Sequence, residues 1–292
     1  MGPSAGQLGF DGMPRRLLQA APSRLATYLD CPRRYRFTYL DRPPPPKGPP
    51  WAHNSLGASV HTALANWWKL PVEARTPDRA GDLLDEAWLG EGYRDDRQRE
   101  VTRRRARAMV VAYVETLDPT DEPIGIERTV ALKTDHAALF GRVDRIDDRG
   151  SEGLVVVDYK TGRQLLSVDD ARTSLALAVY AAGAERTLRR SCRRVELHHL
   201  PSGTVLSWEH TSAGLDRHLR RADSIAEEIA TLDARFRQGI GPEEADDAYP
   251  AQVGPLCAWC DFNRSCPEGA AFIEPREPWA GVEPPAPPGR SH

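Results

Sequence analysis

The period of the hydrophobic pattern changes near residue 124, and this change limits the fold more than any other feature of the chain. Before it, Leu56, Val60, Leu64 and Trp67 recur at helical intervals. After it, the segments ERTVALK, ALFGRVDRID and GLVVVDYK alternate between apolar and polar residues and are separated by Asp, Arg and Gly. We therefore expect a helical N-terminal part followed by three antiparallel strands.

The remainder of the chain continues this mixture of helices and strands. We expect helices over about 22–31 with Ser23 as N-cap, from about 54, and over 78–90, 94–117, 169–188 and 212–238, and further strands over 194–200 and 204–210. This order predicts an α/β (mixed α+β) fold around one sheet. Residues 1–21 and the Pro-rich tail 275–292 lack apolar periodicity, so we expect one folded domain over 22–274 between two disordered ends.

Composition excludes some classes of protein. With 40% hydrophobic residues the chain can bury a core, and no segment approaches the roughly 20 apolar residues that span a bilayer. The N-terminus carries no apolar stretch of signal-peptide length. We expect a cytoplasmic protein with no membrane partner. The net charge of −3 neither favours nor excludes a nucleic-acid partner, because it averages over local patches.

Lysine is rare in this chain, and one lysine stands at a chemically informative position. Only four of the 39 basic residues are lysines, and Lys160 ends the apolar run that begins at Leu154. Because strand side chains alternate, Asp158 and Lys160 project from the same face of a buried strand. An acid and an ammonium together at the end of such a strand indicate a site.

A second acid is expected beside them. If the second and third strands form a hairpin centred near Ser151, Asp144 lies opposite Asp158 on the same face. Two adjacent carboxylates repel each other unless a cation lies between them, and oxygen ligands suit Mg²⁺ or Mn²⁺. This pattern predicts metal-assisted hydrolysis of a phosphodiester, with Lys160 stabilising the phosphate or orienting water. The alternative is two ordinary charged strand ends.

The cysteines form a second constellation. Three of the five fall in LCAWCDFNRSC as Cys257-x2-Cys260-x5-Cys266, and Cys31 stands far upstream in YLDCPRRY. In a reducing compartment such spacing favours a metal site over a disulfide. Zinc and an iron–sulfur cluster both remain open on the residues alone. The fifth cysteine, Cys192, is expected to be a buried thiol.

Several of these segments together resemble a known family. GRVDRID followed by VVDYKTG resembles the core of the PD-(D/E)XK nucleases, particularly the RecB-type exonuclease branch with the AddB nuclease domain and the CRISPR-associated iron–sulfur nucleases. SRLATYLDCPRRYRFTYL, GASVHTAL and SLALAVYAAG look like the branch's N-terminal helix, histidine helix and the helix after the motif. The resemblance implies a restriction-endonuclease-like core with a central mixed sheet flanked by helices. The implied parts are a helical part 22–120, a catalytic core 121–240 and a cysteine segment 250–268.

The resemblance also implies roles for individual residues. Asp144, Asp158 and the backbone carbonyl of Tyr159 would hold the metal, and Lys160 would be the catalytic lysine. The remaining implied site residues are His61 as a further metal ligand, Glu127 on the first strand and Tyr180 on the following helix. One position departs from the family, because the usual glutamine four residues before the tyrosine is Ala176 here.

For the cysteines, the resemblance implies that Cys31, Cys257, Cys260 and Cys266 hold a [4Fe–4S] cluster that joins the two ends of the domain. Zn²⁺ is the competing occupant.

The implied activity is that of a DNA exonuclease in repair or recombination, acting on single-stranded DNA or DNA with free ends. Arg33, Arg34 and Arg163 are candidate phosphate contacts. The chain has no GxxxxGK[ST] phosphate loop, so a helicase partner would be a separate polypeptide. The alternative, motivated by Ala176, is a catalytically weak or inactive DNA-binding scaffold of the same fold.

Overall fold

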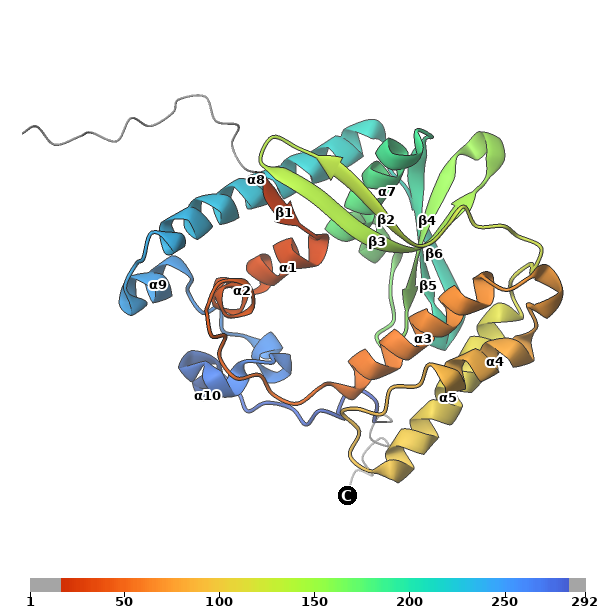
Figure 1. Cartoon of the computed structure of the whole chain (residues 1–292), viewed down its shortest axis with the longest axis horizontal. Coiled ribbons are helices and arrows are strands. Elements are labelled where there is room, and N and C mark those ends of the chain that lie inside the picture. Colours follow the sequence, from red (N-terminus) through yellow and green to blue (C-terminus); the bar gives the residue numbers. More distant parts are fainter. Residues whose placement is uncertain (1–16, 284–292) are drawn as a thin grey trace, which may run out of the picture.

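A six-stranded mixed sheet runs through the structure, a computed structural model that describes residues 17–283 (Figure 1). The strands are β1 (Leu18–Ala20), β2 (Gly125–Lys133), β3 (Ala137–Asp148), β4 (Leu154–Lys160), β5 (Cys192–His199) and β6 (Thr204–Glu209). Their order is β1-β3-β4-β5-β6, and β2 pairs with β3 off this path. The β2–β3, β3–β4 and β5–β6 pairs are antiparallel, whereas β1–β3 and β4–β5 are parallel. The predicted mixed α/β class and the three antiparallel strands are confirmed.

The sheet forks along one edge of β3. Strand β1 pairs with its first part, Ala137–Leu139, and β4 pairs with its last part, Arg145–Asp148. The opposite edge is occupied by β2 along nearly its whole length. Residues 140–144 therefore have no strand partner on the forked edge, because β1 has ended and β4 has diverged. This opening exposes the end of β4 and the middle of β3 to the helices that pack around them.

The helices lie on both faces of the sheet. They are α1 (Pro22–Asp30), α2 (Pro32–Tyr39), α3 (Ala52–Trp68), α4 (Pro77–Glu86), α5 (Asp96–Val114), α6 (Val168–Thr173), α7 (Leu175–Leu188), α8 (Ser212–Arg237), α9 (Pro242–Ala248) and α10 (Pro267–Phe272). The helix expected over 169–188 is two helices, because the Ser174 side chain accepts a hydrogen bond from the Leu177 N–H and starts α7 anew.

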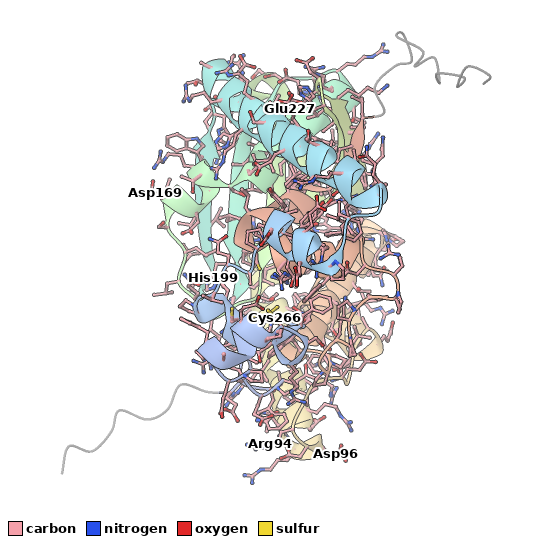
Figure 2. The ribbon with its side chains drawn as sticks, turned by 90° about the vertical axis from the view of Figure 1, so that its left-hand side faces the viewer. Arg94, Asp96, Asp169, His199, Glu227 and Cys266 are labelled. Carbon is pink, nitrogen blue, oxygen red and sulfur yellow. The ribbon has the colours of Figure 1, made fainter. Side chains whose placement is uncertain are left out.

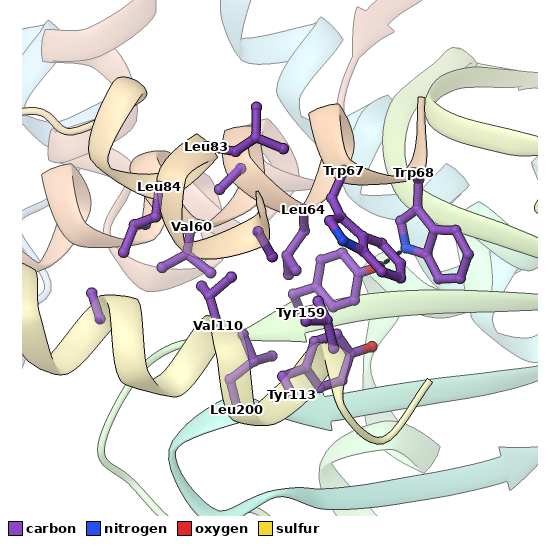
Figure 3. Close-up of a cluster of buried hydrophobic side chains, with 14 of the residues drawn as sticks. Val60, Leu64, Trp67, Trp68, Leu83, Leu84, Val110, Tyr113, Tyr159 and Leu200 are labelled. Atoms are coloured by element: carbon purple, nitrogen blue, oxygen red, sulfur yellow. Dashed lines mark hydrogen bonds between the residues drawn. The ribbon is translucent and has the colours of Figure 1, made fainter. Parts of the chain in front are cut away.

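Alternation along β4 divides the core between two layers. Val155, Val157 and Tyr159 pack against α3, α4 and α5 in one cluster (Figure 3). Leu154 and Val156, on the other face, pack against α7 in a second cluster. Both faces of β4 are therefore buried, as its continuous apolar run predicts.

A third cluster fastens the N-terminal segment to the far end of the sheet. Strand β1 and helix α1 pack against α8, with Leu25 and Ile229 fully buried. Two predictions are wrong here. Residues 18–20 form a strand within the segment expected to be disordered, and the N-cap of α1 is Ala21, with Pro22 rather than Ser23 opening the helix. The rest of that segment, residues 1–16, lies outside the described residues.

The described tail is also ordered, contrary to the prediction for residues from 275 onward. The Ala52 N–H donates to the Pro278 carbonyl at 3.0 Å, and Arg94 pairs with Glu283 at 3.4 Å. These contacts lay residues 276–283 against the start of α3 and of α5. The expectation for residues 284–292 falls outside the described part of the chain. Within residues 17–283, no helix is both long and apolar enough to cross a bilayer.

Candidate active site

The forked edge of β3 brings the predicted acids together. Arg145 pairs with Val157 and Ile146 with Val156, so the next position out places Asp144 opposite Asp158, as the hairpin register predicts. On the other edge, Arg145 pairs with Ile126 and Val143 with Arg128, which leaves Glu127 beside Asp144. Glu127, Asp144 and Asp158 thus occupy neighbouring positions on three adjacent strands.

A compact group of donor atoms forms where α3 meets this row. Ligand atoms of His61, Glu127 and Asp144 all lie within 4.8 Å of one another, the one such group of three found among the described residues. His61 Nδ1 lies 3.1 Å from Asp144 Oδ1. Glu127 has a backbone φ of +48°, which is strained for a residue with a side chain and interrupts β2 at this point. Its carboxylate thereby joins the group, although Arg142 also contacts it at 2.6 Å.

Asp158 lies just outside that group and contacts Lys160. Lys160 Nζ lies 2.7 Å from Asp158 Oδ2, with the lysine side chain 45% exposed and that of Asp158 only 18% exposed. Despite this ion pair, Asp158 Oδ2 makes no hydrogen bond of regular geometry. A buried carboxylate oxygen without a well-directed donor fits a position where a cation binds. The lysine head group remains accessible from solvent.

The backbone of Tyr159 is held against Asp144 by two sets of contacts. Its N–H donates to Asp144 Oδ2 at 2.8 Å, so the peptide that precedes the Tyr159 carbonyl is fixed beside that carboxylate. Its phenol points the opposite way, into the core, where it accepts a hydrogen bond from Trp68 Nε1 at 3.3 Å (Figure 3). The end of β4 is therefore anchored on both sides.

Beneath Tyr159 lies a buried polar network that the sequence did not reveal. Arg145, 3% exposed, contacts Asp147 at 2.9 Å and reaches the Tyr113 hydroxyl at 3.4 Å. The Tyr113 hydroxyl lies 2.7 Å from His198 Nδ1, and His198 Nε2 lies 3.0 Å from Glu196. The network crosses from α5 to β5. The only sequence signal was the strand alternation that placed Arg145 inward.

The site perturbs the pKa values of its own acids and its histidine. Burial raises the pKa of Asp158, an effect that the Lys160 ammonium opposes and the Asp144 carboxylate reinforces. Burial likewise raises the pKa of Glu127, with Arg142 acting against it. For His61, burial lowers the pKa, but the hydrogen bond and charge of Asp144 outweigh it, so the net shift is upward. All three shifts come from crowding carboxylates in a poorly hydrated space, and a bound cation would relieve that crowding.

Tyr180 stands over the fork on α7. A Cβ built on Gly141 would lie 2.3 Å from Tyr180 Cε1, so the ring occupies the space that any side chain at position 141 would need. Burial raises the pKa of Tyr180 to about 12, with further contributions from Asp158 and Asp144. The phenol is therefore a neutral donor near both carboxylates. Ala176, one helical turn earlier, offers no side-chain hydrogen bond.

Comparison with known protein families shows which family the chain belongs to. The family model of the PD-(D/E)XK nuclease superfamily matches residues 19–267. The chain belongs to this superfamily. Its members are metal-dependent nucleases that hydrolyse phosphodiesters, and a carboxylate and histidine group of the required kind is present at the fork of this nuclease. None of the curated proteins matches the chain.

The four cysteines of the nuclease line one pocket without closing into a tight cluster. Cys31 from the α1–α2 junction lies there with Cys257, Cys260 and Cys266. No three of these thiols belong to a group of donor atoms mutually within 4.8 Å in the described part of the chain. A Cβ on Gly269 would lie 3.5 Å from Cys266 Sγ and 3.7 Å from Cys257 Sγ, so the absence of a side chain there keeps the sulfurs open to one space.

Two of the arginines expected to bind DNA lie at this cysteine pocket. Arg33 is buried and donates to the Tyr249 carbonyl at 2.9 Å while pairing with Asp246 and Glu268, and its contact with phosphates stays a prediction. Arg34 lies at the edge of the pocket, 3.9 Å from Asp30. Burial raises the pKa of Cys260 and of Cys266, and the positive charges of Arg34 and Arg33, respectively, oppose this effect.

Arg163 behaves differently, because it lines a large pocket next to Lys160. The pocket runs between α3, α5 and the residues after β4, and the tail residues Gly281 and Val282 form part of its wall. Arg105 on α5 also lines it, and no acidic residue within the described chain pairs with Arg105 or Arg163. Its neighbours Arg103 and Arg107, by contrast, bind carboxylates of α4.

Proposed function

We propose that this chain is a metal-dependent deoxyribonuclease that degrades DNA from a free end during repair or recombination. The observation that carries the proposal is the meeting of His61, Glu127 and Asp144 at the fork of the sheet, with Asp158 and Lys160 beside them. Carboxylate oxygens with one imidazole form a hard donor set that suits Mg²⁺ or Mn²⁺.

The proposed ligands are Asp144, Asp158, His61 and the backbone carbonyl of Tyr159, with Glu127 close enough to bind directly or through water. When bound, the cation supplies Lewis-acid stabilisation of the negative charge that develops on the phosphate. The polar network beneath Tyr159 fixes the strand end, so the carbonyl and the carboxylates need not reorganise when substrate arrives.

The other side chains act on the phosphate and the water. The exposed Lys160 ammonium can reach a phosphate oxygen and stabilise its charge, or hold an attacking water in line, while its contact with Asp158 keeps it in place. Tyr180 can donate a hydrogen bond from the opposite side, since its phenol stays protonated at neutral pH. Arg163 and Arg105 would bind the phosphates of the neighbouring nucleotides.

The walls of the pocket beside Lys160 support the proposed preference for an end. Its lining comes from α3, α5 and the tail, and the tail is tied to both helices by the Pro278 and Glu283 contacts. A strand that reaches Lys160 between these segments enters more easily by an end than by its middle.

Cleavage of matched linear and circular single strands tests this proposal. With Mg²⁺ or Mn²⁺ the protein should degrade the linear strand at least tenfold faster than the circle, and chelation should stop both reactions. Equal rates on both substrates would contradict the preference for ends. DNA binding without cleavage across several divalent metals would instead favour the inactive scaffold that Ala176 raised as an alternative.

We further propose that Cys31, Cys257, Cys260 and Cys266 hold a [4Fe–4S] cluster. A single zinc ion at about 2.3 Å from four sulfurs would require them within roughly 4 Å of one another, closer than the arrangement here, whereas a cluster needs wider spacing. The surroundings suit the negative charge of a cluster held by four thiolates, because the Gln252 N–H donates to Cys31 Sγ at 3.4 Å and Arg33 and Arg34 line the same pocket. The cluster would join α1 and α2 to the C-terminal segment.

Anaerobic purification with iron, sulfide and zinc analysis tests the cluster. The wild-type protein should contain about four irons and four sulfides per chain and be coloured. Cys31→Ser should lower the iron content and the unfolding midpoint, whereas Cys192→Ser, at a buried cysteine of β5 far from the pocket, should retain iron. Stoichiometric zinc in a colourless wild-type protein would refute the cluster.

A further inference from the structure

A basic cleft lies where α6, the end of β6 and the start of α8 meet. Its main lining residues are Arg172, Trp208, His210, Arg217, His218 and Arg221, and its volume is about 370 Å³. Among residues 17–283, no acidic side chain lines it. In a chain of net charge −3, three guanidinium groups with a single paired carboxylate, that of Asp169, form a local positive field.

Two of the three arginines of the cleft lack a carboxylate partner among the described residues. Arg217 and Arg221 face it from one side of α8, four residues apart, and within residues 17–283 no carboxylate forms an ion pair with either. Like charges at this spacing on a helix repel each other and destabilise it. Arg172 is oriented by Asp169 at 2.9 Å and by the Trp208 ring, 6.0 Å from its guanidinium carbon. Asp169 itself lies at the outer edge of the molecule, which leaves the other side of Arg172 to the cleft (Figure 2).

The start of α8 adds a second source of positive potential. Its first turn contains no acidic residue, and its cap, Thr211, satisfies only the Gly214 N–H, at 3.0 Å. The first N–H groups of a helix and its dipole attract anions. A Cβ on Gly214 would lie 3.8 Å from Arg217 Nη2 and 3.9 Å from His210 Nδ1, so the guanidinium and the imidazole converge on the same small space.

His210 supplies an independent sign of a missing ligand. Its side chain lines the cleft, is only 3% exposed, and its Nε2 has no hydrogen-bond partner within the described structure. The rings of His218 and Trp208 lie edge to face against it, with ring centroids 5.3 and 6.4 Å away. A buried imidazole nitrogen without a partner is costly unless something occupies the cleft to bind it.

The cleft lies on the same sheet face as the active site. Asp158 pairs with Leu197 and Leu197 with Leu206, while Trp208 stands two residues further along β6 on the face that packs against α7. At about 4.8 Å per strand and about 3.3 Å per residue, the Cα atoms of Asp158 and Trp208 lie roughly 12 Å apart. Because α7 covers this sheet face between the two places, a nucleic-acid strand would instead run over the segment that leads from Lys160 to α6, whose Arg172 lines the cleft.

We propose that this cleft is a phosphate-binding subsite that holds the backbone of the DNA strand at a distance from the cleaved bond. Arg172, Arg217 and Arg221 bind the phosphate oxygens, and the first turn of α8 and His210 complete the set. The subsite carries no base-reading group in a groove, so it adds affinity and direction without sequence preference. The proposal deepens the proposed nuclease function but requires only that the chain bind nucleic acid.

Fluorescence anisotropy with a labelled single-stranded oligonucleotide tests the subsite, with the full-length protein in EDTA so that no cleavage occurs. The double variant Arg217→Gln/Arg221→Gln should bind about tenfold more weakly than wild type, and the slope of log K against log salt should become shallower by about two. Arg220→Gln is the matched control, because this exposed arginine lies on the same helix but outside the cleft. Unchanged circular dichroism and unfolding midpoints would show that all variants fold.

Further measurements distinguish a nucleic-acid phosphate from free phosphate as the ligand, and the proposed subsite from the proposed nuclease function. Equal oligonucleotide affinity in the double variant and the Arg220→Gln control would overturn the subsite. If the double variant loses inorganic phosphate binding, measured by calorimetry, but keeps its oligonucleotide affinity, the subsite is also overturned, because the cleft then binds free phosphate. Hydrolysis of bis(p-nitrophenyl) phosphate, which is too small to reach the cleft, should be the same in both variants and wild type. Its absence from wild type would count against the nuclease and leave the binding result standing.

Discussion

The contact between Gly141 and Tyr180 predicts that Gly141→Ala destabilises the protein when Tyr180 is present and stabilises it when Tyr180 is replaced by alanine. In Gly141→Ala the new Cβ would lie 2.3, 3.1 and 3.2 Å from three carbons of the Tyr180 ring, and a carbon at the first of these distances cannot be accommodated. The Tyr180 ring must therefore move away from β3 and lose its packing at the fork of the sheet. Overpacking of this kind costs about 1–3 kcal/mol.

In a Tyr180→Ala background the same substitution should stabilise the protein. No ring then opposes the methyl group, and alanine in a strand is more favourable than glycine by about 0.5–1 kcal/mol. The coupling energy between the two positions should therefore be about 1.5–4 kcal/mol. Urea unfolding of wild type, both single variants and the double variant measures it. A Gly141→Ala effect of the same sign and size in both backgrounds would refute the contact.

Two further predictions concern pH and the missing glutamine. Burial lowers the pKa of His210 from 6.5 to about 4, so its contribution to stability is present above pH 6.5 and is lost as pH falls towards 4. Relative to His210→Gln, the free energy of unfolding of wild type should fall by about 2 kcal/mol between pH 7 and pH 5 in urea titrations, and parallel pH profiles of the two proteins would contradict this. Ala176→Gln, one turn before Tyr180 on α7, should increase single-turnover cleavage or DNA affinity about two- to tenfold, the worth of one added hydrogen bond, and a decrease in both would count against a substrate-facing role for this position.

Short-range patterns in the sequence predicted the centre of the fold. The alternation in β3 and β4 and one turn position were enough to align Asp144 with Asp158, because a hairpin register depends on neighbouring residues. The cysteine spacing likewise predicted which thiols would share a pocket. In both cases the decisive information lies within a few residues, apart from Cys31, which was placed by resemblance.

What the sequence did not predict depends on contacts between distant segments. Strand β1 has only three residues and forms because Ala137–Leu139 offers it an edge more than a hundred residues away. The tail from residue 276 is ordered by α3 and α5, and Arg33 is buried by Asp246 and Glu268. Propensity and periodicity carry no information about such pairings, so these segments were predicted to be disordered or exposed.

The positive φ of Glu127 is another feature that the sequence did not predict. Nothing in ERTVALK marks its first residue as left-handed, yet this conformation brings the carboxylate to His61 and Asp144. Strain of this kind persists only where the surrounding structure imposes it, and it is found where a site needs it.

The cleavage rate of Lys160→Ala under single-turnover conditions with Mn²⁺ tests the central claim most directly. Lys160 is the cationic group at the proposed site, and Lys133→Ala is a matched control, since it removes another strand lysine at the end of β2. The account predicts at least about a 100-fold loss for Lys160→Ala, the usual effect of removing one group that stabilises transition-state charge, and a change below about twofold for Lys133→Ala. Cleavage by Lys160→Ala at the rate of the control would contradict it.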